Sequence, residues 1–186
     1  MATVLVPLAQ GVEELEAVTV VDLLRRAGIE VVTAGLDAAP VKGSRGTVLL
    51  PDTTLDRAIE REYDMLVLPG GLPGATHLEQ DARIVTLVRK MAKDKRFTAA
   101  ICAAPKVLAR AGALEGKRAT AYPGVLDPAQ WPNVRLENSS VVTDGRVITS
   151  RGPGTAMDFA LELIGLLAGK EKRDQVEAGL QRGKQI

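Results

Sequence analysis

The chain has 186 residues, of which 46% are hydrophobic, 25% are charged and only 3% are aromatic, and its net charge is +1. This composition predicts one globular domain over residues 1–186 with an aliphatic core. The balanced charge and the scarcity of aromatic rings argue against nucleic acid as a partner. A single cysteine excludes an internal disulfide and favours a reducing compartment, the cytoplasm; together with a single histidine it argues against a metal site.

Short apolar strands alternate with amphipathic helices along the chain. The first strand, residues 3–8, does not have the pattern of a signal peptide, and no segment has the ~18 consecutive apolar residues of a membrane span. Further strands are predicted at 29–34, 64–68, 97–101 and 117–121, and helices at about 12–27, 81–93, 105–111 and 156–168.

Two further segments and a charged tail complete the pattern. Residues 41–50 contain a glycine-rich loop between two apolar pieces and form a hairpin or a loop excursion, whereas 141–149 carries Asp-Gly at its turn and predicts a hairpin. Residues 51–55 resemble the entry to a short helix, and the tail from Gly169 has weak helical tendency. The alternation of strands and helices predicts an α/β fold with a mostly parallel sheet and helices on both faces.

Four loops follow predicted strands and are expected to meet at the carboxyl edge of this sheet, where sites form in such folds. One of them contains Cys102, where the strand 97–101 ends and Pro105 suits the first turn of a helix. A thiol there lies near the amides and the positive end of a helix, which favour the reactive thiolate. Alternatively, Cys102 is a small buried apolar residue.

Glu16 falls on the apolar stripe of the first predicted helix. It lies about 40° from Val20 and about 20° from Leu23 on a helical wheel, so we expect burial to raise its pKa. A protonated Glu16 can donate a hydrogen bond to a thiolate, and an ionised one can act as a general base. The alternative is that it only complements the helix dipole. Glu13 is expected to cap this helix and Glu14 to be solvated.

Backbone amides and two arginines complete the predicted site. Gly70 and Gly71 can present amides to a developing oxyanion, with the amide of Ala103 as a second donor, or they form only a turn. Arg45 and Arg151 lie in loops, where each either binds an anion or is a solvated surface charge.

Four motifs in this order resemble the ThiJ/PfpI superfamily: Gly11–Glu16, Leu68–Gly71, Ala100–Pro105 and Thr149–Thr155. The chain looks most like the branch that contains the Parkinsonism-associated protein deglycase and its bacterial relatives. The resemblance implies a flavodoxin-like three-layer sandwich and a homodimer with the cysteine near the interface. It also implies an oxidation-prone Cys102 stabilised by a protonated Glu16, and no cofactor.

Two departures from the family pattern concern histidine. Many members of this branch carry a histidine at the position of Tyr122, and a phenol there can only hydrogen-bond a substrate oxygen. The protease branch carries a histidine directly after the cysteine, where this chain has Ala103. The only histidine, His77, lies among polar residues and is expected at the surface, so peptidase activity is not predicted.

The leading hypothesis is a glutathione-independent glyoxalase or protein deglycase. Cys102 would add to the aldehyde of methylglyoxal, glyoxal or an early glycation adduct, and Glu16 would move the proton between adjacent carbons. The alternative is a redox sensor or stress chaperone whose Cys102 is oxidised to sulfinic acid. Nucleotide binding is a third reading, but neither G-x-G-x-x-G nor a P-loop is present.

Overall fold

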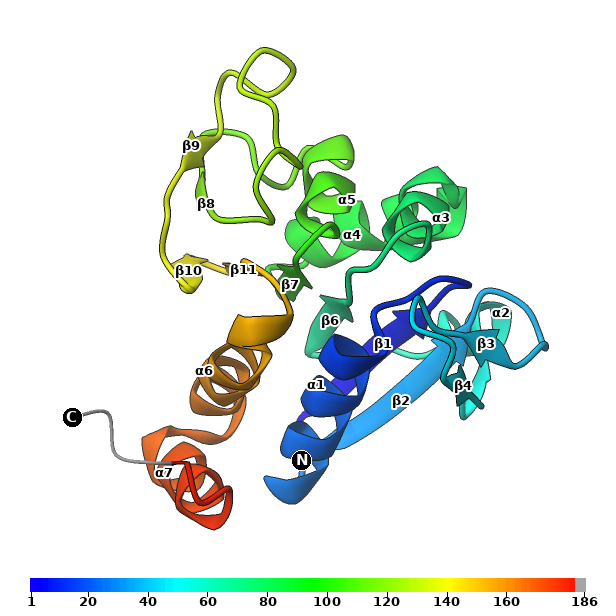
Figure 1. The fold of residues 1–186 in the computed structure, drawn as a ribbon, viewed down its shortest axis with the longest axis vertical. Coiled ribbons are helices and arrows are strands. Elements are labelled where there is room, and N and C mark those ends of the chain that lie inside the picture. Colours follow the sequence, from blue (N-terminus) through cyan, green and yellow to red (C-terminus); the bar gives the residue numbers. More distant parts are fainter. Residues whose placement is uncertain (183–186) are drawn as a thin grey trace.

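The structure is a computed structural model in which residues 1–182 are described (Figure 1). Its central strands are β1 (Thr3–Leu8), β2 (Glu30–Gly35), β5 (Thr53–Thr54), β6 (Met65–Leu68), β7 (Phe97–Ile101), β10 (Val141–Asp144) and β11 (Val147–Ser150). They form a seven-stranded sheet in the order β10-β11-β7-β6-β1-β2-β5. Neighbouring strands are parallel, except that β10 and β11 form an antiparallel hairpin.

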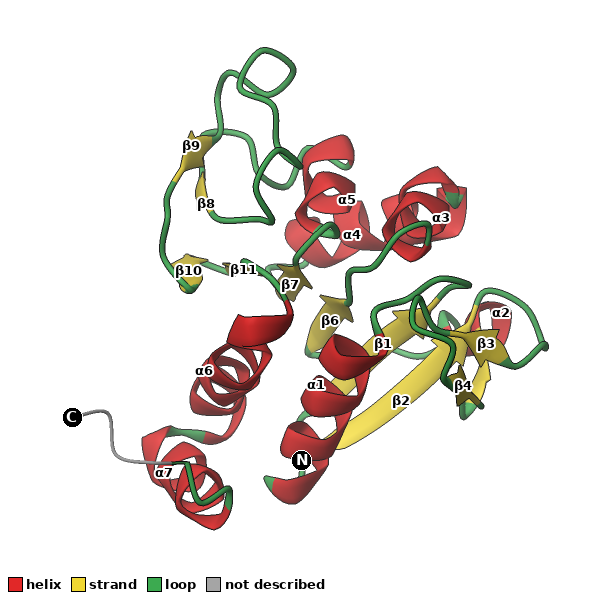
Figure 2. Cartoon of the chain, in the orientation of Figure 1, coloured by secondary structure: helices red, strands yellow, loops and turns green. Residues whose placement is uncertain are grey.

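Helices cover the sheet in two groups. The first comprises α1 (Glu14–Arg26), α6 (Ala156–Ala168) and α7 (Lys170–Gly179), and the second α3 (Gly74–Gln80), α4 (Ala82–Lys93) and α5 (Pro105–Arg110). Figures 1 and 2 show the sheet running between the two groups, which confirms the predicted α/β architecture. No helix within residues 1–182 is long and apolar enough to cross a membrane.

Smaller elements lie at the edges of the sheet. They are α2 (Leu55–Ala58) and two small sheets, one of β3 (Val41–Lys42) with β4 (Val48–Leu49) and one of β8 (Arg118–Ala119) with β9 (Arg135–Leu136). The predicted hairpin at 141–149 is confirmed, and residues 41–50 form a hairpin rather than a loop excursion. The tail with weak helical tendency forms α7, and its last residues, 183–186, lie outside the described part of the chain.

The core is aliphatic, as the composition predicts. All four residues of β6 are buried, and Leu66 pairs with Leu5 of β1 at the centre of the sheet. Leu24 of α1 and Phe159 of α6 are fully buried, and these two helices pack against each other and against the sheet. The carboxylate of Glu13 accepts a hydrogen bond from the backbone N–H of Glu16 (2.8 Å), which confirms the predicted cap of α1.

Helix α3 and strand β5 were not predicted. Residues 69–74 have the composition of a loop, and Gly74 begins α3 without a side-chain cap. Burial of Ala75 and Leu78 stabilises this helix instead. Strand β5 depends on Asp52, whose carboxylate accepts from the backbone N–H (2.9 Å) and the hydroxyl (2.8 Å) of Thr33. A contact between residues so far apart in the chain cannot be predicted from local sequence patterns.

Phe159→Ala is expected to lower the free energy of unfolding by about 3–5 kcal/mol, because the ring is fully buried and its loss leaves a cavity. Urea unfolding followed by circular dichroism measures the change. Met157→Ala on the same helix is the control: its side chain is 44% exposed, so we expect a loss below about 1 kcal/mol. Equal losses in the two variants would contradict the packing described above.

Candidate active site

The loops that follow β1, β6, β7 and β11 meet at the carboxyl edge of the sheet, as predicted. The backbone N–H of Glu13 donates to the carbonyl of Gly70 (2.9 Å), and that of Cys102 donates to the carbonyl of Ser150 (3.0 Å). Main-chain hydrogen bonds therefore hold together segments that are far apart in the sequence. This edge holds the candidate active site.

Cys102 occupies a strained elbow between β7 and α5. Its φ is +63°, in the left-handed region that residues other than glycine rarely adopt. Its N–H is bound to Ser150, and its carbonyl accepts from the backbone N–H of Tyr122 (2.9 Å). Because both peptide groups are fixed, the surrounding loops maintain the strained conformation. The side chain is 9% exposed.

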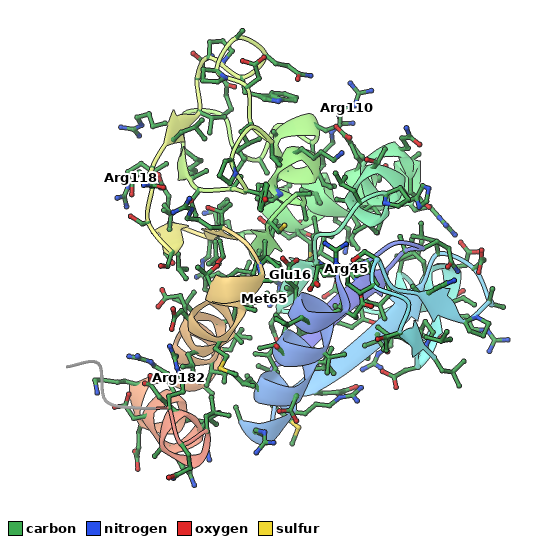
Figure 3. All side chains as sticks on the ribbon, in the orientation of Figure 1. Glu16, Arg45, Met65, Arg110, Arg118 and Arg182 are labelled. Carbon is green, nitrogen blue, oxygen red and sulfur yellow. The ribbon has the colours of Figure 1, made fainter. Side chains whose placement is uncertain are left out.

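Glu16 of α1 lies fully buried at this edge, as the helical wheel predicts (Figure 3). Its Oε2 accepts from the backbone N–H of Gly70 (2.8 Å), and its carboxyl also interacts with the side chain of Cys102. Within residues 1–182 its other oxygen, Oε1, has no hydrogen-bond partner. Burial raises the pKa of Glu16 from 4.5 to about 7, even though the two hydrogen bonds act in the opposite direction.

Two glycines allow this close approach. A Cβ on Gly70 would lie 2.6 Å from Cβ of Cys102 and 2.7 Å from Oε2 of Glu16. Gly71 has a φ of +89°, and a Cβ there would lie 2.3 Å from the backbone nitrogen of Glu13. Any larger residue at either position would push the loops apart.

The protonation states of Cys102 and Glu16 depend on each other. Burial, followed by the charge of Glu16 and the hydrogen bond to it, raises the pKa of the Cys102 thiol to about 12. The amides of Gly71 and Ala103 act in the opposite direction and favour the thiolate. The elbow alone therefore does not give the thiolate that the sequence led us to expect. The pocket accommodates one negative charge, and the sulfur can carry it when Glu16 holds the proton.

Tyr122 and Arg151 lie at the surface near the sulfur. A hollow of about 290 Å³ is lined by Tyr122, Pro123 and residues 151–155. Tyr122 is 54% exposed. A methyl group placed on Gly152 would lie 3.5 Å from the ring of Tyr122 and 4.0 Å from Sγ of Cys102. Gly152 therefore lies between the hollow and the thiol, and its lack of a side chain keeps this approach open.

The expectation that Glu14 is solvated was wrong. Its buried carboxylate accepts from the backbone N–H groups of Arg45 (3.0 Å) and Thr47 (3.1 Å) and from the hydroxyl of Ser44 (3.3 Å). Burial alone would raise the pKa of Glu14, but hydrogen bonds outweigh it and lower the pKa to about 2. Glu14 thus fixes the turn between β3 and β4 beside the site, a role that sequence reasoning missed.

The remaining predicted residues are placed as follows. The backbone N–H of Arg45 contacts Glu14 beside the site, whereas the side chain of Arg45 is exposed (Figure 3). His77 is partly buried rather than fully at the surface, with Nδ1 2.9 Å from the carbonyl of Gln10. Among residues 1–182, no group of three or more histidine, cysteine or acidic side chains is arranged to hold a metal ion.

The fold and this edge define a flavodoxin-like α/β protein with a paired cysteine and glutamate at the carboxyl ends of its strands. The chain belongs to the DJ-1/PfpI family, whose family model matches residues 2–166. This confirms the resemblance that the four motifs indicated.

Known relatives match almost the whole chain. Protein dj-1beta of Drosophila melanogaster is 45% identical over 177 residues, which cover 95% of each chain. The glutathione-independent glyoxalase DJR-1.2 of Caenorhabditis elegans is 35% identical over 175 residues, covering 94% of this chain and 92% of the relative.

Two solved structures confirm the flavodoxin-like fold. The crystal structure of Drosophila melanogaster DJ-1beta superposes with a TM-score of 0.91 at 44% identity, covering 96% of this chain and 97% of that one. Oxidized Toxoplasma gondii DJ-1 has a TM-score of 0.93 at 36% identity, with coverages of 98% and 100%.

Gly70→Ala is expected to slow alkylation of Cys102 by iodoacetamide at neutral pH by about tenfold, the effect of a pKa about one unit higher. The added methyl would overlap Cys102 and Glu16 and move the sulfur away from the amides that favour the thiolate. Gly179→Ala at the end of α7 is the control, since no neighbouring atom lies within 4 Å of its Cβ position. An unchanged rate in Gly70→Ala would show that the pocket is not as tight as described.

Glu16→Gln is expected to change how stability depends on pH. The pKa of Glu16 rises from 4.5 to about 7 on folding, so the folded state retains a proton that the unfolded state loses between these values. The free energy of unfolding of the native protein should therefore fall by about 3 kcal/mol as the pH rises through this window. Urea unfolding at several pH values measures this. Parallel profiles for the two proteins would contradict the raised pKa.

Proposed function

We propose that this protein is a cofactor-independent glyoxalase that converts methylglyoxal or glyoxal to the corresponding hydroxy acid. The observation that carries the proposal is the meeting of Cys102, Glu16 and two backbone amides in one pocket. A relative that is 35% identical and is named a glutathione-independent glyoxalase supports it. The reduced thiol that this chemistry requires fits a cytoplasmic location.

The reaction begins with Glu16 protonated and Cys102 as the thiolate. The sulfur attacks the aldehyde carbon, a C–S bond forms, and the carbonyl electron pair becomes an alkoxide. The N–H groups of Gly71 and Ala103 are the donors that stabilise this oxyanion. Glu16 then transfers its proton to the alkoxide, which leaves a neutral hemithioacetal and a Glu16 carboxylate.

Glu16 next acts as the base. Its carboxylate removes the hydrogen of the former aldehyde carbon to give an enediolate, and the same proton returns to the adjacent carbon. The hydroxyl proton passes to the neighbouring oxygen, so that a thioester of the hydroxy acid remains. Water adds to this thioester, the C–S bond breaks and the hydroxy acid leaves as its carboxylate. One proton of the water returns to Glu16 and the other passes to solvent, so the thiolate and the protonated Glu16 are both restored. One carbon is oxidised while its neighbour is reduced, so no external oxidant is needed.

The hollow at the surface suits the remaining contacts with substrate. The phenol of Tyr122 can hydrogen-bond a substrate oxygen, and the guanidinium of Arg151 can bind the carboxylate of the product. Arg45 lies in the turn that Glu14 holds and is a further candidate for anion binding. Deglycation of proteins would use the same addition of the thiolate to an early adduct.

We also propose that the protein forms a homodimer through α1 and the β3–β4 hairpin. Leu15 and Val18 on α1 are 51% and 49% exposed, and Val48 and Leu50 of the hairpin are 63% and 81% exposed. Apolar side chains exposed together mark a contact surface. Because Glu14 and Glu16 lie on the same helix, such an interface would adjoin the active site.

A redox sensor or stress chaperone is the second candidate function. One similar solved structure is described as oxidized Toxoplasma gondii DJ-1. With a single cysteine, oxidation here cannot end in an internal disulfide and would proceed to sulfenic and sulfinic acids. A protonated Glu16 would donate a hydrogen bond to the sulfinate. Two added oxygens on Cys102 after mild peroxide, without dicarbonyl turnover, would favour this function.

Purified protein is expected to form lactate from methylglyoxal without added glutathione or metal. Cys102→Ser should lower kcat/KM by about 1,000-fold or more, because a hydroxyl is a far weaker nucleophile. Glu16→Gln should lower it by about 100-fold to 10,000-fold, since every proton transfer assigned to Glu16 is lost. Tyr122→Phe should lower kcat/KM by less than about tenfold, because only one hydrogen bond to the substrate is lost. Lys90→Met, on α4 and outside the loops that form the site, is the matched control.

Either of two results would refute the glyoxalase mechanism. One is a wild-type rate in Cys102→Ser or Glu16→Gln, and the other is the absence of lactate from the wild-type protein. Deglycation is tested separately by removing free dicarbonyl before a glycated peptide is added, so that scavenging of the dicarbonyl is not mistaken for repair.

A further inference from the structure

Lys106 carries a positive charge at the N-terminal end of a helix, where a positive charge is unfavourable. It lies in the first turn of α5, where the positive end of the helix dipole disfavours a cation. Its side chain instead crosses to α3, where Nζ donates to Oγ1 of Thr76 (2.8 Å) and lies 3.3 Å from Oε2 of Glu79. The side chains of Lys106 and Glu79 are only 19% and 25% exposed, so this pair is better protected from water than an ordinary surface pair.

The two helices that Lys106 connects follow the two segments that face the sulfur. Helix α5 begins at Pro105, two residues after Ala103, and α3 begins at Gly74, three residues after Gly71. The first turn of α3 is anchored to Gly71, because the backbone N–H of Ala75 donates to the carbonyl of Gly71 (2.8 Å). A displacement of α3 relative to α5 would therefore separate the amides of Gly71 and Ala103.

We propose that Lys106 is a positioning residue, which ties α5 to α3 and thereby holds the amides of Gly71 and Ala103 at the distance that makes Cys102 reactive. The inference rests on the proposed role of Cys102 as the reacting group. Lys106 acts through the two segments and does not touch the reacting atoms. Thr76 and Glu79 are its partners in this role.

The positioning role of Lys106 can be distinguished from a direct effect of its positive charge on the pKa of Cys102. If Lys106 acted only as a nearby cation, its loss would disfavour the thiolate, whereas loss of the Glu79 anion would favour it. If Lys106 acts by positioning, removal of either partner loosens the same contact, and both changes disfavour the thiolate. The signs of the two effects separate the explanations.

The experiment measures the rate of Cys102 alkylation by iodoacetamide as a function of pH. Because the chain has one cysteine, all alkylated thiol is Cys102. Lys106→Met, Glu79→Gln and Thr76→Val are each expected to slow alkylation at neutral pH by about threefold to tenfold, which corresponds to raising the midpoint of the pH profile by about 0.5–1 unit. Lys106→Arg, which retains the charge and can still donate, should recover part of the rate.

Lys90→Met is the matched control, since it removes another helical lysine that pairs with Glu62 and Asp94 (3.6 Å each). It should leave the alkylation profile unchanged. The proposal is overturned if Lys106→Met and Glu79→Gln lower only the melting temperature, or if Glu79→Gln speeds alkylation. Alkylation needs no dicarbonyl turnover, so a protein that makes no lactate but shows these shifts would refute the proposed reaction and leave the role of Lys106 intact.

Discussion

A buried carboxyl and a buried thiol that share one negative charge form the interaction on which this site depends. Two like charges about 4 Å apart repel by about 4 kcal/mol at an effective dielectric constant of 20. The two amides beside the sulfur do not outweigh burial together with an ionised Glu16, which is why the pKa of Cys102 rises to about 12. The proton on Glu16 therefore decides whether the amides act on a thiol or a thiolate.

Parallel strand order is what brings this pair together. Glu16 follows β1 and Cys102 follows β7, with β6 between these strands in the sheet. The Gly70–Gly71 turn after β6 lies against both side chains, and the N–H of Gly70 donates to the carboxyl. A side chain at Gly70 would occupy the space where carboxyl and sulfur meet. The strained φ of Cys102 is maintained by hydrogen bonds from its two peptide groups to Ser150, which ends the neighbouring strand β11, and to Tyr122, which follows β8.

The sequence predicts those features that a single element or the sheet topology determines. The burial of Glu16 follows from its position on the apolar stripe of α1, and the elbow at Cys102 follows from an apolar strand that ends before Pro105. Glu14 shows where this reasoning fails. A helical wheel treats the face away from the stripe as solvent, but the turn at 43–47, about 30 residues later, folds over that face and buries the carboxylate. The pattern of residues within α1 therefore could not predict this contact.

Because position 122 is a tyrosine, the proposed reaction assigns its proton transfers to Glu16 alone. An imidazole near the sulfur could divide the roles of acid and base with Glu16, but the phenol of Tyr122 lies at the exposed surface hollow. In the proposed reaction Glu16 must therefore donate a proton in one step and remove one in the next. A pKa of about 7 suits both, since protonated and ionised forms are then similarly populated at neutral pH. The burial that raises this pKa is thus the property that lets one carboxyl serve as acid and base in turn.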